Sequence, residues 1–543
     1  MFAIIHVIKK YKFVSVSLLI LLAVYSFLPA CNKEKPLNAS SVKVALIHFA
    51  PVYKEPDSNL SELLRLNRLA AEQGASIILN TEMAVSGYSF KSREDISGYT
   101  ETEDGKTITA MIRLALEKGV YIGIALAERD PLTEIYYNSA FIIGPGGKVL
   151  SKYRKIISAE KRWANTGSPY QDGFADTPWG RIGAAICADS YSGLLVRSMA
   201  LKDVDLLWVP TNWPESGGLN PVPIWRARAL ENGFYVAACN RTGIDLSMDC
   251  TKTTSAVFDP DGKTLLSGSS ETSQVFYADI LLNKEGKFAG IKRKEKMAQR
   301  NIEYYRNVYL RPWVEDLTGF YKLPETGIVH VFCYVPEMGD NYLKDIEAQV
   351  EKYTNTHPAL WILPRINNLH MDENWFKEIS IKYNIGLALT VDYPDLSTRA
   401  LLITPDGVFQ FNKDMGEKSE THEFPYNILY FGPAAIAIVP AEELAHPELA
   451  VNLSKLGADL VIVSEQNMTE EDYLVTRVKA LDCMAVAACA ANGAQITDIQ
   501  DMHFNWEKRD LNHSGVLEYI LDTSKTRKKT FYDAVDFDLL LSM

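Results

Sequence analysis

The stretch WRARALENGFYVAACN at residues 225–240 recurs later in the chain as TRVKALDCMAVAACA at residues 476–490. Each copy places a basic residue, an alanine and a leucine in the same order before a shared Ala-Ala-Cys. Apolar residues at helical spacing, followed by a short apolar run, predict a helix and then a buried strand. The likeness of the two copies indicates that the chain contains one structural unit twice.

Five further pairs of segments follow in the same order through the two halves. They are residues 42–50 with 326–337, 114–129 with 377–392, 140–153 with 400–413, 179–191 with 431–444, and 203–214 with 457–468. Strands alternate with helices throughout, which predicts a layered α/β fold. A helix-rich, basic link near 290–325 separates the two halves.

Length and charge limit the classes of protein to which the chain can belong. With 543 residues it is too long for one ordinary core, so we expect two or more domains. The net charge of −12 argues against a general nucleic-acid binder. The seven scattered cysteines do not suggest a disulfide framework, and no zinc-binding spacing is present.

The N-terminus has the pattern of a targeting segment. Lys9, Lys10 and Lys12 precede the apolar run 14–28, and the run ends in LPAC at 28–31. This run is shorter than the roughly 20 residues that a membrane-spanning helix needs, and the whole segment predicts a signal peptide. It resembles a bacterial lipoprotein signal, which is cleaved before a cysteine that then carries the lipid.

We therefore expect a signal peptide over 1–30, a lipid on Cys31 and a tether over 31–41. The protein would then be a membrane-anchored lipoprotein of the bacterial cell envelope, periplasmic or surface-facing. An uncleaved anchor helix and an ordinary signal peptide are the alternatives.

Three residues of the first half, at the ends of predicted strands, are candidates for a catalytic site. They are Glu82, Lys155 and Cys187, and an α/β sheet usually presents its ligands where its strands end. A thiolate is a strong nucleophile for an amide or nitrile carbon, but a free thiol needs a base at neutral pH. Glu82 can be that base, and Lys155 can stabilise the oxyanion.

The segments around these residues resemble the nitrilase superfamily of carbon-nitrogen hydrolases. They are TEMAVSGY at 81–88, YYNSAFIIGPGGKVLSKYRK at 136–155, GRIGAAICAD at 180–189 and WRARALENG at 225–233. The resemblance covers about 42–312 and implies a Glu82, Lys155 and Cys187 triad. It also implies α-β-β-α sandwiches that pair through their helices into a four-layer dimer, so we expect tandem sandwiches with a degenerate second copy.

The resemblance implies further site residues. In EKRWANTG at 160–167, Glu160 would orient Lys155 or activate the hydrolytic water; the alternative is an exposed glutamate at a helix start. The backbone N–H of Ala188 would join the oxyanion site. Tyr88, Trp163, Asn212 and Trp213 would line the substrate pocket or pack in the core. No metal or cofactor is expected, and Cys239 and Cys489 are interpreted as buried structural thiols.

The second half lacks these groups. Residues 363–366 (LPRI), where Glu82 would stand, contain no acid. Met415 or Lys413 would replace Lys155, and Val439 would replace Cys187. We therefore expect a catalytic domain over 42–312, a linker over 313–325 and a silent domain over 326–543. The silent copy would pair with the first as an intrachain pseudo-dimer, or would bind a polymer or partner.

These features predict a membrane-anchored amidase. It would cleave a non-peptide C–N bond of a small amide or N-carbamoyl substrate through a cysteine thioester. A nitrilase acting on a nitrile, an N-acyl transferase and a non-enzymatic surface binding lipoprotein are the alternatives. Substrate identity, the choice of membrane and further oligomerisation are left open by the sequence.

Overall fold

The computed structural model describes most of the chain from residue 40 onward. The described residues are 40–158, 160–214, 220–302, 305, 316–337, 342–353, 356–367, 373–394, 397–411, 426–482, 484–499, 506–529, 531 and 534–542. The predicted signal peptide, Cys31, and Lys413 and Met415 of the second half lie outside them. No helix within these ranges is long and apolar enough to cross a membrane.

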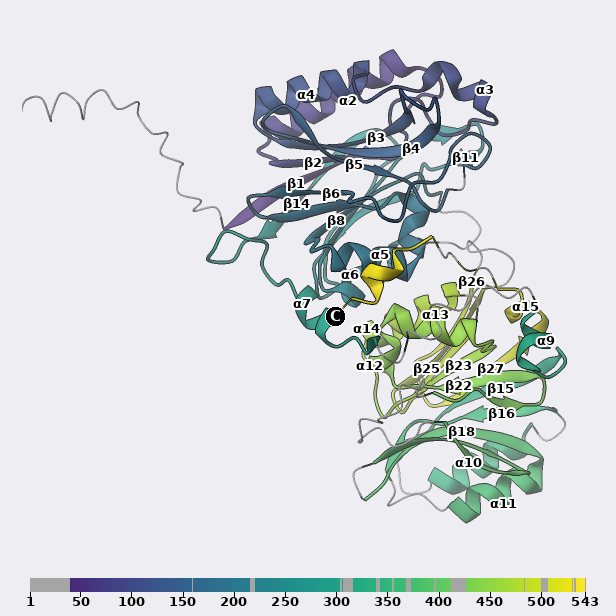
Figure 1. Cartoon of the computed structure of the whole chain (residues 1–543). Coiled ribbons are helices and arrows are strands. Elements are labelled where there is room, and N and C mark those ends of the chain that lie inside the picture. Colours follow the sequence, from purple (N-terminus) through teal and green to yellow (C-terminus); the bar gives the residue numbers. More distant parts are fainter. Residues whose placement is uncertain are drawn as a thin grey trace, which may run out of the picture.

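Two six-stranded sheets stack face to face in the first half (Figure 1). One has the order β14-β1-β2-β3-β4-β5 and the other the order β13-β12-β9-β8-β7-β6. The first comprises β1 (Ser41–His48), β2 (Ile77–Asn80), β3 (Tyr121–Arg129), β4 (Tyr136–Gly144), β5 (Lys148–Arg154) and β14 (Gln274–Leu281). The second comprises β6 (Phe174–Thr177), β7 (Gly180–Ala184), β8 (Leu206–Thr211), β9 (Tyr235–Asn240), β12 (Thr254–Phe258) and β13 (Thr264–Ser269).

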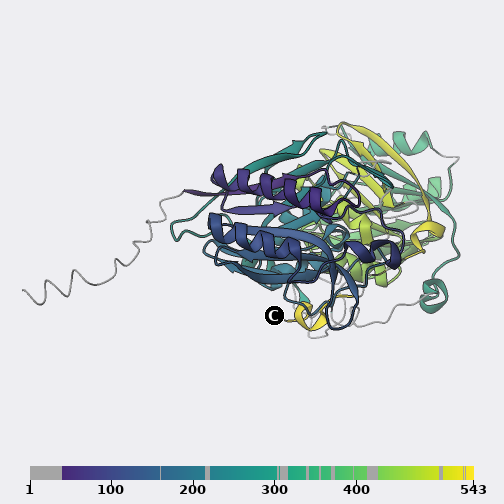
Figure 2. The same ribbon diagram turned by 90° about the horizontal axis from the view of Figure 1, so that it is seen from above.

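Helices cover the outer faces of this pair of sheets. Helices α2 (Pro56–Glu72) and α4 (Lys106–Lys118) run side by side over one sheet (Figure 2). Helices α5 (Gly193–Leu201) and α6 (Val222–Asn232) cover the other (Figure 1). Proline at the first position of α2 and the left-handed Gly119 after α4 are usual helix boundaries. The α-β-β-α layering expected for the first half is therefore present.

The second half has the same strand order. One sheet runs β20-β19-β18-β16-β15-β27 and the other β21-β22-β23-β24-β25-β26. The first comprises β15 (Ile328–Val335), β16 (Ala359–Ile362), β18 (Ile385–Asp392), β19 (Thr398–Thr404), β20 (Gly407–Gln410) and β27 (Gly515–Asp522), and the two-residue strand β17 (Ile366–Asn367) also pairs with β18. The second comprises β21 (Leu429–Phe431), β22 (Ala434–Ile438), β23 (Leu460–Ser464), β24 (Ala485–Ala490), β25 (Gly493–Ile499) and β26 (Trp506–Leu511). The covering helices are α10 (Tyr342–Glu351), α11 (Glu373–Tyr383), α13 (Pro447–Lys455) and α14 (Glu470–Val478).

The two thiols shared by the repeats occupy matching places. Cys239 is the fifth residue of β9 and Cys489 the fifth of β24, and neither is exposed to solvent. The Cys239 thiol donates to carbonyl oxygens of β1 and β2 in the facing sheet. The Cys489 thiol donates to carbonyl oxygens of the corresponding strands of the second half, β15 and β16. Both are buried packing groups, as predicted.

The prediction that Val439 takes the place of Cys187 in the second half is wrong: the structure puts the counterpart two residues later in the chain. Asp205 exchanges hydrogen bonds with the main chain of Arg181 in the first half, and Asp459 does the same with Ala435 in the second. Downstream, the amide of Ala185 binds the carbonyl of Trp208, and the amide of Val439 binds that of Ile462. Val439 therefore corresponds to Ala185, and Ala441 stands in the place of Cys187. Alanine is no more a nucleophile than valine.

The halves meet through the helices that face each other in the middle of Figure 1. Helix α6 packs against α14, and α5 packs against α13. Ion pairs cross this seam: Arg197 lies 3.4 Å from Glu448, and Lys479 lies 2.5 Å from Glu231, with all four side chains buried.

Candidate active site

Strand ends bring the three predicted reactive residues to one buried place. Glu82 follows β2, Lys155 follows β5, and Cys187 opens the short 3-10 helix η2 (Cys187–Tyr191) just beyond β7. Their exposed fractions are 0%, 1% and 8%. Glu160, in the loop after β5, is 5% exposed, so the alternative of a surface glutamate is wrong.

Lys155 lies between two carboxylates. Its Nζ atom donates to Glu82 Oε1 at 2.8 Å and to Glu160 Oε1 at 2.6 Å. Ser158 also donates to Glu160, at 2.8 Å, and the hydroxyl of Tyr88 donates to it as well. Glu160 is therefore a hydrogen-bond partner of Lys155, a geometry compatible with the orienting role, which is one of the two roles considered for it.

Two asparagines hold Glu82. Asn138 Nδ2 donates to Glu82 Oε1 at 2.7 Å, and the backbone N–H of Asn212 donates to Oε2 at 2.9 Å. The side-chain amide of Asn212 also donates to the carbonyl of Glu82 at 3.0 Å. Its Oδ1 atom is buried and has no hydrogen-bond partner among the residues that the structure describes. Asn212 therefore positions the base and still presents a free acceptor.

The buried charges set which groups are ionised. Burial raises the pKa of the Cys187 thiol, Glu82 raises it further, and Lys155 opposes them, so the resting thiol is protonated. Burial and the nearby Glu160 also raise the pKa of Glu82 despite Lys155 and Asn138. A carboxylate with a raised pKa is a better proton acceptor for a thiol.

Lys155 remains a cation. Burial would lower its pKa, but Glu160 and Glu82 hold the pKa well above its ordinary value. Burial acts on Glu160 in the raising direction, but Lys155 and the hydroxyl donors bring the pKa of Glu160 below its ordinary value. A fixed cation beside an ionised carboxylate can stabilise negative charge that develops on the oxygen of a carbonyl group under attack.

Asp189 connects the turn that begins with Cys187, here called the nucleophile turn, to the segment that follows Lys155. Cys187 has a φ of 48°, a left-handed conformation that costs energy for a side chain with a Cβ and persists only where its surroundings impose it. Asp189 accepts the N–H of Ile186 at 3.1 Å on one side and that of Ile157 at 2.6 Å on the other. The hydroxyl of Tyr153 donates to it at 2.9 Å. The turn is thus fixed relative to the end of β5.

The aromatic residues expected in the pocket are partly core residues. Trp163 is buried in a cluster with Met83 and Phe90, against which Tyr88 packs. The ring of Trp213 lies 4.4 Å from that of Tyr191 and belongs to the main core. Tyr88 reaches the site through its hydroxyl, and Ala188 follows Cys187 in η2.

Asn138 and Asp189 were missed by the sequence analysis. Asn138 and its neighbour Ser139 are polar residues in a strand whose other residues are aromatic, apolar or glycine, and that pattern could have singled Asn138 out. No three His, Cys, Asp or Glu side chains within the described ranges are grouped so as to hold a metal ion.

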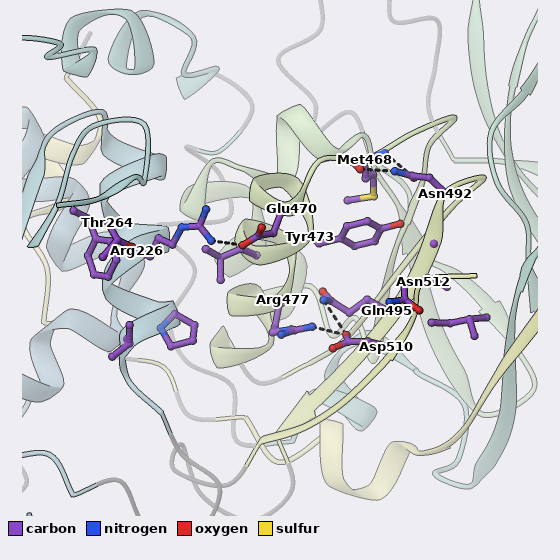
Figure 3. Close-up of a pocket in the computed structure, with 17 residues that line it drawn as sticks. Arg226, Thr264, Met468, Glu470, Tyr473, Arg477, Asn492, Gln495, Asp510 and Asn512 are labelled. Carbon is purple, nitrogen blue, oxygen red and sulfur yellow. Dashed lines mark hydrogen bonds and ion pairs between the residues drawn. The ribbon is translucent and has the colours of Figure 1, made fainter. Parts of the chain in front are cut away.

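A pocket of about 660 Å³ lies at the seam between the halves, apart from the triad (Figure 3). Arg226 projects from α6 on one side of it, and Glu470, Tyr473 and Arg477 project from α14 on the other. None of the reactive residues of the first half lines it.

Comparison with known proteins gives the class. Residues 43–290 match the family described as Carbon-nitrogen hydrolase. A nitrilase of Pyrococcus abyssi is 32% identical over 244 residues, which cover 44% of this chain and 89% of that protein. An omega-amidase of Mus musculus is 30% identical over 259 residues, covering 45% of this chain and 90% of that protein. The crystal structure of an amidase from Nesterenkonia sp. is matched over 49% of this chain and 96% of that chain, with 22% identity and a TM-score of 0.41.

The chain therefore belongs to the carbon-nitrogen hydrolase family of the nitrilase superfamily, through residues 43–290. The residues beyond 290 lie outside that match.

Proposed function

We propose that the chain is an amidase that hydrolyses a small amide or N-carbamoyl compound through a thioester on Cys187. The observation that carries the proposal is the buried placement of Lys155 between Glu82 and Glu160, beside the Cys187 turn. These groups provide a base, a fixed cation and a nucleophile, which are the parts that acyl transfer to a thiol needs.

The reaction follows from these groups. Glu82 takes the thiol proton while sulfur attacks the carbonyl carbon, and Lys155 with the N–H of Ala188 stabilises the oxyanion. The C–N bond breaks as Glu82 returns the proton to the leaving amine, leaving a thioester on Cys187. Water, deprotonated by Glu82, then attacks the thioester and releases the acid, and the thiol regains its proton. The balance is amide plus water giving acid plus amine.

The free oxygen of Asn212 favours an amide over a nitrile. Its Oδ1 atom is a buried acceptor with no partner in the described part of the chain, which is costly unless a ligand supplies a donor. The NH2 group of an amide or carbamoyl substrate is such a donor, whereas a nitrile carries none. Asn212, Tyr88, Trp163, Trp213 and Ala188 are proposed as the substrate-binding residues.

The test is ammonia release by the purified full-length chain from a panel of amides, N-carbamoyl compounds, ureides and nitriles. Release from amides or carbamoyl compounds that vanishes in Cys187→Ala is the expected result. Loss of all activity in this variant would also show that the second half is silent. Release from nitriles alone would contradict the amidase assignment, and no release from any compound would contradict a hydrolase.

Alkylation supplies a test that needs no substrate. Cys187 is 8% exposed and lies beside a base, whereas Cys239 is fully buried in the core. Mass spectrometry of peptides from the native protein should show iodoacetamide on Cys187 first, and slower labelling of Cys187 in Glu82→Gln. Equal labelling of Cys187 and Cys239 would contradict an activated nucleophile.

We also propose the cellular setting predicted by the sequence, a bacterial envelope lipoprotein anchored through a lipid on Cys31. Metabolic labelling with a radioactive fatty acid should mark the parent chain and not Cys31→Ser, which should leave the membrane fraction. Equal labelling of the two chains would contradict the anchor.

The half over 326–543 is proposed as a degenerate copy of the catalytic domain that pairs with it as an intrachain pseudo-dimer. The shared strand order and the contacts of α6 with α14 and of α5 with α13 support this proposal.

A further inference from the structure

We propose that Lys479, which lies in the half without a nucleophile, is a positioning residue for Cys187 and acts through Glu231 and Arg228. The inference rests on the proposed function, because it concerns the reactivity of the same thiol. It gives the silent half a part in the reaction beyond packing.

Arg228 holds the turn that carries the nucleophile. Its Nε atom donates to the carbonyl of Ser190 at 2.9 Å, and its Nη2 atom donates to the carbonyl of Tyr191. The hydroxyl of Ser190 donates to the carbonyl of Cys187 at 2.7 Å. Because Cys187 has a strained backbone conformation, its geometry depends on such external bonds.

Glu231 holds Arg228 in place. Its Oε2 atom accepts from Arg228 Nη1 at 2.5 Å, and its Oε1 atom accepts from Lys479 Nζ at 2.5 Å. All three side chains are at most 3% exposed, so this ion-paired group is buried at the seam. Burial alone would raise the pKa of Glu231, but Arg228 and Lys479 together hold the pKa below its ordinary value.

The repeat explains why Lys479 is in position. In the duplicated helical segment, Arg228 of the first copy corresponds to Lys479 of the second. Lys479 still donates to the carbonyl of Ala445, at 3.2 Å, and in the register of β22 Ala445 is the counterpart of Tyr191. The bond of Lys479 to Ala445 is therefore equivalent, within the second half, to the bond of Arg228 to Tyr191 in the first. Lys479 also donates to Glu231 across the seam.

The consequence is a chain of contacts from the silent half to the thiol. Removal of Lys479 leaves the Oε1 atom of Glu231 buried without a donor, which is more costly than a lost exposed pair. Among the described residues, Arg228 is then the one cation still bonded to the Glu231 carboxylate, and it can reach both oxygens only by leaving the carbonyls of Ser190 and Tyr191. The Cys187 turn loses its support.

The test uses the full-length chain and the isosteric variant Lys479→Met. We expect kcat and the alkylation rate of Cys187 to fall about tenfold with little change in KM, at temperatures where circular dichroism shows the variant folded. Arg226→Gln is the matched control. Arg226 lies on the same helix and reaches Glu470 at 2.5 Å across the same seam, but has no bond to the turn (Figure 3). It should lower stability without changing either rate.

A double-mutant cycle separates positioning from general loosening of the seam. Glu231→Gln should itself slow the thiol, and adding Lys479→Met should cost little more, because both act through one path. Unchanged rates in folded Lys479→Met, equal loss in Arg226→Gln, or additive losses in the double variant would each overturn the proposal. A parent chain with neither hydrolysis nor selective alkylation of Cys187 would instead overturn the proposed function.

Discussion

The Oδ1 atom of Asp189 accepts the backbone N–H of Ile157 at 2.6 Å, and this bond joins the segment after Lys155 to the turn that begins with Cys187. In Asp189→Asn an amide donor would face either the N–H of Ile157 or the N–H of Ile186. A donor facing a donor in a buried site is unfavourable. We expect kcat to fall about tenfold or more with a smaller change in KM, measured by steady-state ammonia release.

Tyr153→Phe is the control for this variant. It removes a single hydrogen bond to Asp189 and leaves the three backbone donors, Ile156, Ile157 and Ile186, paired. Its loss of kcat should be clearly smaller than that of Asp189→Asn. Equal losses would mean that the tyrosine hydroxyl, and not the bridge between the two segments, positions the site.

The pH dependence of the reaction should report the ionisation of Glu82. The base must be deprotonated to act, so kcat/KM falls on the acid side as the pH drops through its pKa. Asn138 lowers the pKa of Glu82 by donating to it. Asn138→Ala therefore raises this pKa, and the acid limb of kcat/KM should move to higher pH.

Ser158→Ala is the matched control, because Ser158 donates to Glu160 and not to Glu82. Its acid limb should stay close to that of the parent chain. If the parent chain, Asn138→Ala and Ser158→Ala all had the same acid limb, the limb would not report the ionisation of Glu82.

The reactive residues could be predicted from the sequence because each lies at or shortly after the end of a predicted strand, in segments that resemble a known family. Glu82 lies just beyond the apolar run of β2, and Lys155 directly follows β5, whose polar and apolar residues are mixed; such strands end at one edge of the sheet. The partners that hold them could not be placed this way. Asp189 acts on Ile157 across a loop, and only the folded chain brings the two together.

The counterpart of Cys187 illustrates a second limit. The run AAIAIV at 434–439 contains only apolar residues, so sliding it by two positions keeps the same face inward. The pattern therefore does not distinguish Val439 from Ala441. The register is set by the hydrogen bonds between Asp459 and Ala435. This contact joins neighbouring strands, and the local sequence around either residue does not indicate it.

Gly193 should tolerate no side chain at the seam. A Cβ at this position would lie 2.5 Å from Cβ of Pro447, its counterpart in the register of β22. A proline ring cannot turn aside, so Gly193→Ala should destabilise the chain by about 1–3 kcal/mol through overpacking. Gly98→Ala is the control, because a Cβ there meets nothing within 4 Å. Denaturant unfolding would measure both, and equal stabilities would contradict the close approach of the halves.

Glu448 should make the seam sensitive to acid. Burial works to raise its pKa, but Arg197, Arg300 and His446 lower it from 4.5 to about 2. A carboxylate with a depressed pKa stabilises the folded state above its unfolded pKa, and this contribution is lost as the pH falls from about 4.5 through 2. The shift of the Glu448 pKa from 4.5 to about 2 corresponds to about 3 kcal/mol of folding stability.

The measurement is the free energy of unfolding of the full-length chain between pH 5 and 2. Glu448→Gln removes the titrating group, so its stability should start lower and decline less steeply than that of the parent. Glu62→Gln is the control, because this partly exposed carboxylate forms an ion pair with its helical neighbour Arg65, far from the seam. It should keep the steep decline of the parent. A Glu448→Gln chain that declines as steeply as the parent would place the acid-sensitive group elsewhere, because a glutamine at 448 binds no proton in this range.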